Sequence, residues 1–405
     1  MSYSPSKHIL QNYANILVNY ALGNGKGIKP GDVVQLVTKD SAKLLYEELY
    51  RAVILAGGHV LTQYVPDDPS DNNLERFFFS HGNEEQINFY PQAYYDTLID
   101  TIDHRLTVLS EENPHSLKGI DPKLIMQRNV ARSHFREAFF KKVNAKKATW
   151  TLALYATEGM AKEAGLSLEA YWEQIIEACY LREKNPVATW KNLQKEIHTV
   201  KDWLNALDIR KVHVESEDAD LWITIGEQRK WMAATGQNIP SYEIFTSPDW
   251  RGTEGWIRFN QPLYRYGNLI EGIELEFKEG LVVNSKATKN ENVLKEMIAT
   301  KDADKVGEFS LTDKRHSRIT KFMANTLYDE NVGGKYGNTH IAVGMAYKDA
   351  YNGDPSTLTK EDWERLGLND SVVHTDIMST KDRTVTAVLA DGSKRVIYKE
   401  GMFQT

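Results

Sequence analysis

Strand-like segments alternate with helical segments through the first part of the chain, and this alternation is the strongest constraint on its fold. Short runs rich in β-branched and apolar residues are separated by stretches whose apolar residues recur at helical spacing. Strands separated by helices pair in a parallel sheet, with the helices as crossovers. We therefore expect residues 1–207 to form an open α/β domain with a mainly parallel sheet that ends in two long helices. The expected strands are GDVVQLVT (31–38), HVLTQYV (59–65), RLTVLS (105–110) and ATWTLALYAT (148–157).

The pattern changes after about residue 208, where strand-like runs follow one another across short turns. Runs of strands with few helices are typical of an α+β domain with a largely antiparallel sheet. A chain of 405 residues is long for one core, which also favours two domains. We expect the second domain to span residues 208–405 and to carry the functional site. Its expected strands fall within 211–216, 220–227, 255–260, 266–288 and 384–401, and its expected helices within 290–301 and 318–328.

Composition narrows the classes of function. The net charge is -7, and interspersed acidic and basic residues give no general attraction to nucleic acid or to anionic membranes. The single cysteine, Cys179, has no partner for an intrachain disulfide, which favours a reducing compartment. The chain contains no apolar stretch of about 18 residues, and its first segment has the pattern of an amphipathic helix instead of a signal peptide. We expect a soluble, cytoplasmic protein.

His374 and Asp376 form the most compact group of candidate metal ligands. They lie two residues apart in SVVHTDIMS, so in a strand both side chains point to the same face. An imidazole and a carboxylate are good donors to a divalent ion. A chance pair with this spacing is common, and the pair taken alone favours an ordinary structural role.

Two further regions supply isolated candidates. Glu330 and His340 flank a glycine-rich loop, and Tyr347 lies seven residues beyond the histidine. The glycines would let the backbone bend sharply beside a site, although they would also serve a surface loop. Glu243 and Glu308 each lie among apolar or small residues, where a carboxylate is rare unless it is paired or bound to metal. The sequence also allows each of these two glutamates to be an exposed loop residue.

Four ordered segments resemble those of the M29 metallopeptidases, the aminopeptidase T and aminopeptidase S group. The resemblance runs through the whole chain, and the four segments together are specific where any one would not be. The first two motifs are P-x-x-E-x-F-T-x-P at 240–248 and G-E-x-x-L at 307–311. The third is Y-D-E-N…G-N-T-H-I-A-x-G-x-A-Y at 328–347, and the fourth is the H-x-D of residues 374–376.

The resemblance implies a metal-dependent aminopeptidase that acts on peptides with a free N-terminus and assembles as a homodimer. It implies that two divalent ions are held by Glu243, Glu308, Glu330, His340, His374 and Asp376. A bridging Glu308 would hold the ions about 3.5–4 Å apart, and it could also carry a proton to the leaving amine. Tyr347 would hydrogen-bond the developing oxyanion. Four carboxylates would balance two divalent ions, and an oxygen-rich set without thiolate leaves Zn²⁺, Co²⁺, Mn²⁺ and Mg²⁺ open.

Two other classes of function use the same residues. A two-metal phosphoesterase has similar ligands and often adds basic groups for the phosphate, for which Lys335 and Lys348 are candidates. In a metal-braced peptide-binding scaffold, the ions would only stabilise the second domain and Tyr347 would be a core residue. The residues by themselves indicate a two-metal hydrolase, and the peptidase assignment comes from the resemblance.

Overall fold

The computed structural model describes residues 3–68, 70, 73–233, 235–265 and 268–405. The chain divides into two compact units, the first formed by Met1–Lys191 and Thr235–Ile239, the second by Asn192–Ala234 and Pro240–Thr405. The domain boundary expected at residues 207/208 falls just after helix α10 (Pro186–Ala206), whose residues from Asn192 onwards cluster with the second unit. The boundary expected at residues 207/208 stays a prediction.

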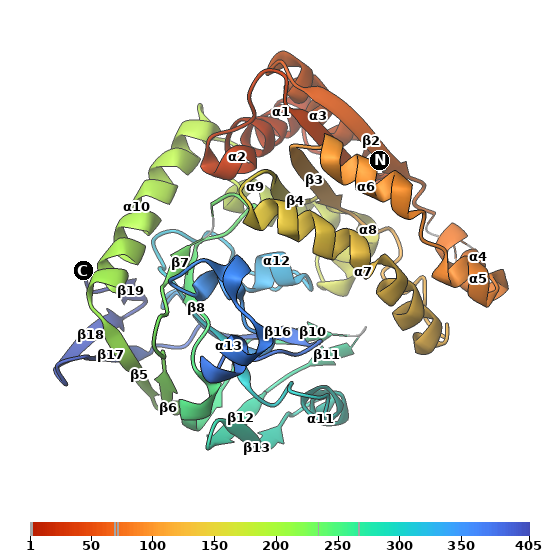
Figure 1. Ribbon diagram of the computed structural model, residues 1–405. Helices are drawn as coiled ribbons and strands as arrows, with labels where there is room; N and C mark the ends of the chain where they lie inside the picture. The colour runs from red at the N-terminus through yellow and green to blue at the C-terminus, as the bar shows by residue number, and fades with distance from the viewer. Residues whose placement is uncertain (1–2, 69, 71–72, 234, 266–267) are drawn as a thin grey trace. The chain divides into compact units, whose positions relative to one another are not determined.

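The first unit contains a four-stranded parallel sheet with the strand order β2-β1-β3-β4 (Figure 1). The central strands β1 and β3 consist of buried and partly buried residues, whereas β2 is a largely exposed edge strand. All four strands lie where the β-branched runs of the sequence predict them, and the parallel pairing is confirmed. The strands are β1 (Val33–Lys39), β2 (His59–Val65), β3 (His104–Leu109) and β4 (Thr149–Leu154).

Helices separate the strands of this sheet, as the crossover pattern predicts. Helix α1 packs against α3, and both α5 and α6 contact the long α7. Ile99 and Ile102 of the α6 region form a small buried core with Phe139 of α7. The helices are α1 (Lys7–Ile16), the π-turn η1 (Leu17–Ala21), α2 (Leu22–Gly25), the 3₁₀ turn η2 (Asp40–Ala42), α3 (Lys43–Leu55), α4 (Leu74–His81), α5 (Glu84–Asn88), α6 (Gln92–Thr101), α7 (Pro122–Asn144), α8 (Glu158–Glu163) and α9 (Leu168–Ala178).

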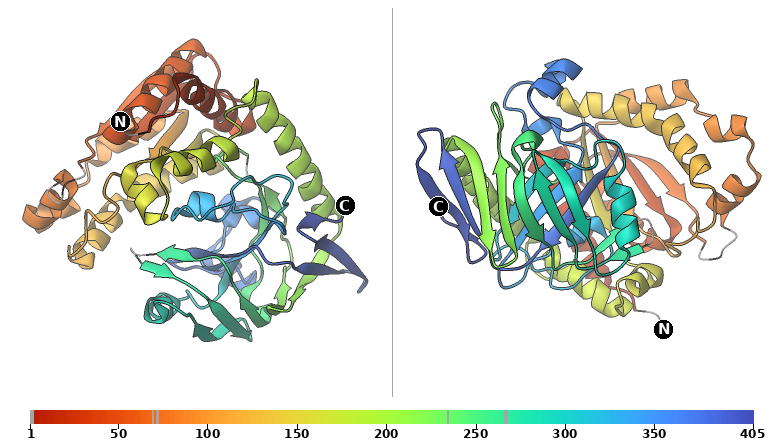
Figure 2. Two further views of the ribbon diagram at one scale, coloured as in Figure 1. Left: turned by 180° about the vertical axis from the view of Figure 1, so that it is seen from behind. Right: turned by 90° about the horizontal axis from the view of Figure 1, so that it is seen from below.

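The second unit contains an eight-stranded antiparallel sheet with the order β13-β12-β9-β6-β5-β17-β18-β19. The right-hand view in Figure 2 shows its strands side by side, from the teal β12 and β13 to the dark blue β18. The antiparallel character expected for this half of the chain is confirmed. The strands are β5 (Ile209–Ser216), β6 (Ala219–Thr224), β9 (Glu254–Arg258), β12 (Glu274–Lys278), β13 (Leu281–Lys286), β17 (Thr384–Leu389), β18 (Lys394–Lys399) and β19 (Met402–Phe403).

A second antiparallel sheet of the same unit, with the order β16-β15-β14-β8-β7, positions the candidate site. Its central strands β14 and β15 are buried along their whole length, which is typical of a strand covered on both faces. The strands are β7 (Met232–Ala233), β8 (Glu243–Thr246), β14 (Val306–Thr312), β15 (Asn338–Gly344) and β16 (His374–Ser379). A separate two-stranded ribbon pairs β10 (Leu263–Arg265) with β11 (Asn268–Ile270).

After α10 the helices of the second unit are short, and one expected helix is absent. Residues 318–325 have no helical structure, so the helix expected at 318–328 is wrong except for its last turn, α12. The Asp329 carboxylate explains this, because it accepts hydrogen bonds from the amides of Met323 and Asn325 and holds the segment in an irregular turn. The remaining elements are α11 (Glu291–Ile298), α12 (Thr326–Asp329), α13 (Lys360–Arg365) and the 3₁₀ turns η3 (Trp250–Gly252), η4 (Lys348–Ala350) and η5 (Pro355–Thr357).

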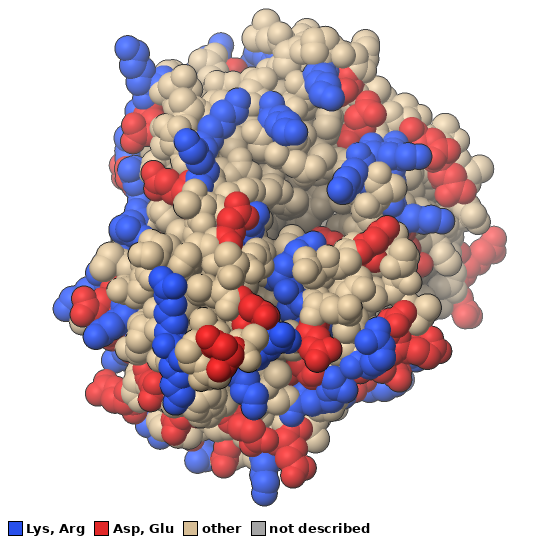
Figure 3. Space-filling view, turned by 60° about the vertical axis from the view of Figure 1, so that its left-hand side comes forward, with Lys and Arg blue, Asp and Glu red and all other residues tan. Residues whose placement is uncertain are grey.

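Surface charge and helix hydropathy agree with the composition. On the face drawn in Figure 3, basic and acidic side chains are intermixed and form no continuous basic patch. Among the helices that the structure describes, none has the length and apolar character needed to cross a membrane.

Candidate metal centre

Strand pairing places five of the predicted ligands on one face of the five-stranded sheet. In the register of the sheet, Ala342 of β15 lies opposite both Glu308 and Asp376, while Ser310 lies opposite His340. Residues that are paired or two positions apart share a face, so the side chains from four strands converge. The five residues are Glu243 at the start of β8, Glu308 in β14, His340 in β15, and His374 and Asp376 in β16.

The convergent side chains form two donor groups that share Glu308. In the first, His340 Nε2 lies 3.3 Å from an oxygen of Glu243 and 3.2 Å from Oε1 of Glu308. In the second, His374 Nε2 lies 3.5 Å from Asp376 Oδ1 and 3.8 Å from Oε2 of Glu308. The donor atoms of each group lie within 4.8 Å of one another. Because the two oxygens of Glu308 face different histidines, this carboxylate is placed to serve both groups.

Neighbouring groups orient several of these side chains. The carbonyl of Met345 lies 2.8 Å from His374 Nδ1 and accepts a hydrogen bond from it, which leaves Nε2 to act as a donor to a metal. Ser310 donates a hydrogen bond of 3.1 Å to Glu243. The Nδ1 atom of His340 is buried and has no hydrogen-bond partner among the residues that the structure describes.

Without a bound metal, protons offset part of the negative charge of the clustered carboxylates. Burial raises the pKa of Glu308 to about 7. Burial lowers the pKa of His340, but hydrogen bonds with Glu243 and Glu308 outweigh it, so that the pKa lies well above its usual 6.5. Burial also lowers the pKa of His374, but the charge of Asp376 outweighs it and raises this pKa to about 9. Burial raises the pKa of Asp376, but the charge of His374 lowers it to about 2. A divalent ion has to displace such protons, so metal binding should weaken as the pH falls.

Glu330 lies close to these residues but is not part of either donor group. It follows α12 as its C-cap residue and is half-buried. Burial, followed by the negative charges of Glu243 and Asp376, raises its pKa well above the usual 4.5. The glycine-rich loop therefore leaves Glu330 within electrostatic reach of the site.

Tyr347 lies at the open side of the site. Its ring centroid is 4.8 Å from that of His374, with the rings inclined by 60°, and its side chain is 38% exposed. Partial burial, together with the charges of Glu308 and Asp376, raises the pKa of its hydroxyl, which therefore keeps its proton. The Tyr347 amide donates a hydrogen bond of 2.8 Å to the hydroxyl of Ser247.

The supporting serines Ser310 and Ser247 were not predicted from the sequence. Ser310 lies two residues from Glu308 on the same strand, so the alternation used for His374 and Asp376 would have found it. Ser247 occupies a variable position of the first motif and carries no such signal.

The donor set fits divalent ions. Carboxylate and imidazole groups converge without a thiolate, and His340, whose pKa is raised, lies between carboxylates where a cation would be favourable. Carboxylates and imidazoles gathered in two donor groups on one sheet are the arrangement that a metal-dependent hydrolase needs.

Comparison with known proteins gives the family. The family model described as thermophilic metalloprotease (M29) matches residues 6–403, and the chain belongs to this family. It is therefore a metal-dependent peptidase, and the resemblance seen in its motifs is confirmed.

Individual relatives are similar to this chain over most of its length. Aminopeptidase PepS from Streptococcus thermophilus is 29% identical over 419 residues, which cover 98% of each protein. Aminopeptidase AmpS from Bacillus subtilis (strain 168) is 31% identical over 308 residues, which cover 71% of this chain and 74% of the relative. The solved structure of wild-type AmpT from Thermus thermophilus matches with a TM-score of 0.83 and 24% identity, covering 98% of this chain and 100% of that one, and it confirms the expected fold class.

Proposed function

We propose that this peptidase is an aminopeptidase that removes the N-terminal residue of peptides and works with two divalent ions. The sharing of Glu308 between two donor groups is the observation that carries the two-metal assignment. The names of the relatives PepS and AmpS support the aminopeptidase assignment.

In this proposal each ion has its own protein ligands. Glu243, Glu308 and His340 would hold one ion, and Glu308, His374 and Asp376 would hold the other. Glu330 would be a sixth ligand that approaches from the end of α12, as the family resemblance implies. The oxygen-rich set does not select among Zn²⁺, Co²⁺, Mn²⁺ and Mg²⁺.

The bound ions would supply Lewis acidity for the peptide carbonyl and for an attacking water molecule. The Tyr347 hydroxyl donates a hydrogen bond to the carbonyl oxygen as negative charge develops there, since its raised pKa keeps the phenol neutral. Glu308 holds the two donor groups together. Glu308 is also expected to carry a proton to the leaving amine. This role competes with the contacts that its two oxygens make with His340 and His374. Two bound metals and normal turnover in Glu308→Gln would rule out the proton transfer.

The deciding experiment combines metal analysis with an assay on an aminoacyl p-nitroanilide. We expect two metal equivalents, loss of activity with a chelator, and recovery when a divalent ion is added back. Tyr347→Phe should keep both metals but lower kcat by about 10²- to 10³-fold, the usual cost of removing one oxyanion donor. Absence of bound metal and of activity after add-back would refute the proposal.

The two competing functions predict other outcomes. Lys335 and Lys348 lie over the rings of Tyr336 and Trp363, so both proposed phosphate-binding groups contact their own neighbours. Turnover of p-nitrophenyl phosphate without turnover of the anilide would nevertheless favour a phosphoesterase. The scaffold hypothesis needs Tyr347 in the core, whereas its side chain is 38% exposed.

We further propose that the protein is a homodimer and is cytoplasmic. Large apolar side chains on α4, α6 and α7 and next to α5 are exposed, and such surfaces often mark an interface with a second copy. A molecular mass equal to that of one chain, measured by light scattering at all protein concentrations, would refute the dimer. The lone, buried Cys179 supports a reducing compartment, which cell fractionation can test. The exposed residues are Leu74, Phe77, Phe89, Tyr94, Met126 and Val130.

A further inference from the structure

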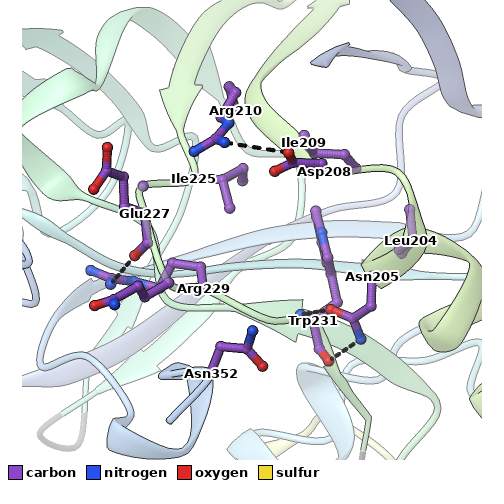
Figure 4. A pocket seen from close by; sticks show the side chains of 12 residues that line it. Leu204, Asn205, Asp208, Ile209, Arg210, Ile225, Glu227, Arg229, Trp231 and Asn352 are labelled. Carbon is purple, nitrogen blue, oxygen red and sulfur yellow. Dashed lines mark hydrogen bonds and ion pairs between the residues drawn. The ribbon is translucent and has the colours of Figure 1, made fainter. Parts of the chain in front are cut away.

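Arg229 joins three separate segments of the second unit through its guanidinium group. Nε donates a hydrogen bond of 2.8 Å to the carbonyl of Ser247, and Nη1 donates one of 3.0 Å to the carbonyl of Glu227. Nη2 donates to the carbonyl of Leu366, just after α13. Figure 4 shows Arg229 beside Glu227 in the wall of a cavity of about 540 Å³. The three nitrogens thus fix the positions of three backbone segments.

One of these segments also holds Tyr347. Ser247 is completely buried, and its hydroxyl accepts the hydrogen bond of 2.8 Å from the Tyr347 amide. The carbonyl of the same serine accepts from Arg229. Ser247 therefore connects Arg229 directly to the backbone of the tyrosine beside the metal centre.

The backbone around Arg229 holds the segment that follows Tyr347. Arg229 forms an antiparallel bridge with Tyr351. On either side of this bridge, Lys230 donates to the carbonyl of Ala350 and Asn352 donates to the carbonyl of Gln228, at 2.9 and 2.8 Å. The chain is thus fixed both at Tyr347 and a few residues later. Little freedom remains for the tyrosine except rotation of its side chain.

The guanidinium geometry is difficult to replace. Arginine offers donors in a rigid planar fork, whereas lysine has a single ammonium group at the end of a flexible chain. Lysine cannot span the three carbonyls that Arg229 reaches. The nearby Asp249 pairs with Arg251, and the hydrogen bonds that Arg229 donates go to backbone carbonyl groups.

We infer that Arg229 is a positioning residue for Tyr347, acting through Ser247 to hold the phenol beside His374. The inference rests on the proposed function, in which Tyr347 stabilises the oxyanion. The hydrogen bonds that Arg229 donates go to backbone carbonyls and not to a proposed metal ligand, so its effect should depend on the presence of the tyrosine hydroxyl.

The kinetic test uses Arg229→Lys, Ser247→Ala and Tyr347→Phe, singly and with each of the first two combined with the third. Misplacement of a reacting group by about 1 Å costs up to about 10²-fold in rate, so we expect Arg229→Lys to lower kcat by about 10- to 100-fold. KM and metal content should change by less than about twofold, because ground-state binding is retained. In the Tyr347→Phe background, neither further substitution should lower kcat appreciably. Ser247→Ala keeps the carbonyl for Arg229 and tests the tyrosine contact alone.

Arg383→Lys is the matched control. Arg383 is a buried arginine of the second unit that donates a hydrogen bond to the carbonyl of Arg258 and pairs with Asp218. Its substitution should lower the melting temperature without the kcat effect that depends on Tyr347. An equal loss of kcat from Arg229→Lys with and without the tyrosine hydroxyl would overturn the inference, and so would unchanged kcat in both Arg229→Lys and Ser247→Ala.

A second measurement does not depend on activity. With 3-fluorotyrosine at position 347 of the complete chain, the ¹⁹F signal reports the surroundings of the ring. We expect Arg229→Lys and Ser247→Ala to shift or broaden this signal and Arg383→Lys to leave it unchanged. An unchanged signal in both test variants would overturn the inference. If Tyr347→Phe has normal turnover, the proposed role of the tyrosine fails, while the ¹⁹F result still decides whether Arg229 positions it.

Discussion

Glu308→Gln should have opposite effects on stability in the metal-free and the metal-loaded protein. Without metal, burial raises the pKa of Glu308 to about 7 from its usual 4.5. Its proton is therefore bound more tightly in the folded state, so the stability it contributes is complete below pH 4.5 and is lost as the pH rises toward 7. One pKa unit corresponds to 1.36 kcal/mol, so the ionised group costs the metal-free protein about 3 kcal/mol above pH 7.

Glutamine at this position carries no charge and escapes that cost. For a unit of roughly 200 residues, Tm changes by about 2–4 °C per kcal/mol, so chelator-treated Glu308→Gln should melt about 6–12 °C above the chelator-treated wild type at pH 7.5. The two proteins should converge near pH 4.5. With metal present the order should reverse, because the substitution removes the donor that both groups share.

Scanning calorimetry between pH 4.5 and 8, with chelator and with metal, measures both effects. Glu276→Gln is the control, since Glu276 is an exposed glutamate of β12 and its loss should alter neither curve appreciably. A metal-free Glu308→Gln that melts below the wild type at pH 7.5 would show that Glu308 is not destabilised by its surroundings. Equal Tm values in the presence of metal would contradict its role as a shared ligand.

Two further predictions concern Gly344, at the end of β15, and Asp313, which follows β14. Gly344 has a φ of 101°, and an added Cβ would lie 2.0 Å from the carbonyl oxygen of Val373, so Gly344→Ala should cost at least about 1–3 kcal/mol; an unchanged Tm would refute this. Burial raises the pKa of Asp313, but hydrogen bonds from Arg315 and from the Phe403 amide lower it below the usual 3.8. This carboxylate therefore contributes stability above pH 3.8 that is lost as the pH falls through its folded-state pKa, and Asp313→Asn should lower Tm at pH 7 while flattening the acid limb of the Tm profile. A parallel acid limb in both proteins would contradict the assignment.

The first unit follows closely from its sequence because its elements are determined locally. The β-branched run at residues 59–65 coincides with β2, and the run at 105–110 is displaced by one residue from β3. Parallel pairing then follows from the helices between the strands. The segment 318–325 is different, since its conformation depends on the Asp329 carboxylate and no local periodicity reports that contact.

The candidate site was predictable as a set of residue types but not as an arrangement. Alternation places His374 and Asp376 on one face, and the structure agrees. The same reasoning could not pair β14 with both β8 and β15, because these partners are far apart in the sequence. The sharing of Glu308 depends on that pairing, and so does the hydrogen bond from Ser310 to Glu243.

The complete burial of β14 and β15 has a consequence for hydrogen exchange. Strand β15 is paired along both edges, and β14 is paired with β15 and, over Phe309–Thr312, with β8, so most of their amides can exchange only when the sheet opens. Glu308 and His340 therefore belong to the part of the unit whose amides should exchange most slowly. An ion held there would not escape through fraying of a loop, and its release would be limited by the side chains themselves. Deuterium uptake at β14 and β15 should then stay slow even in protein from which a chelator has removed the metal.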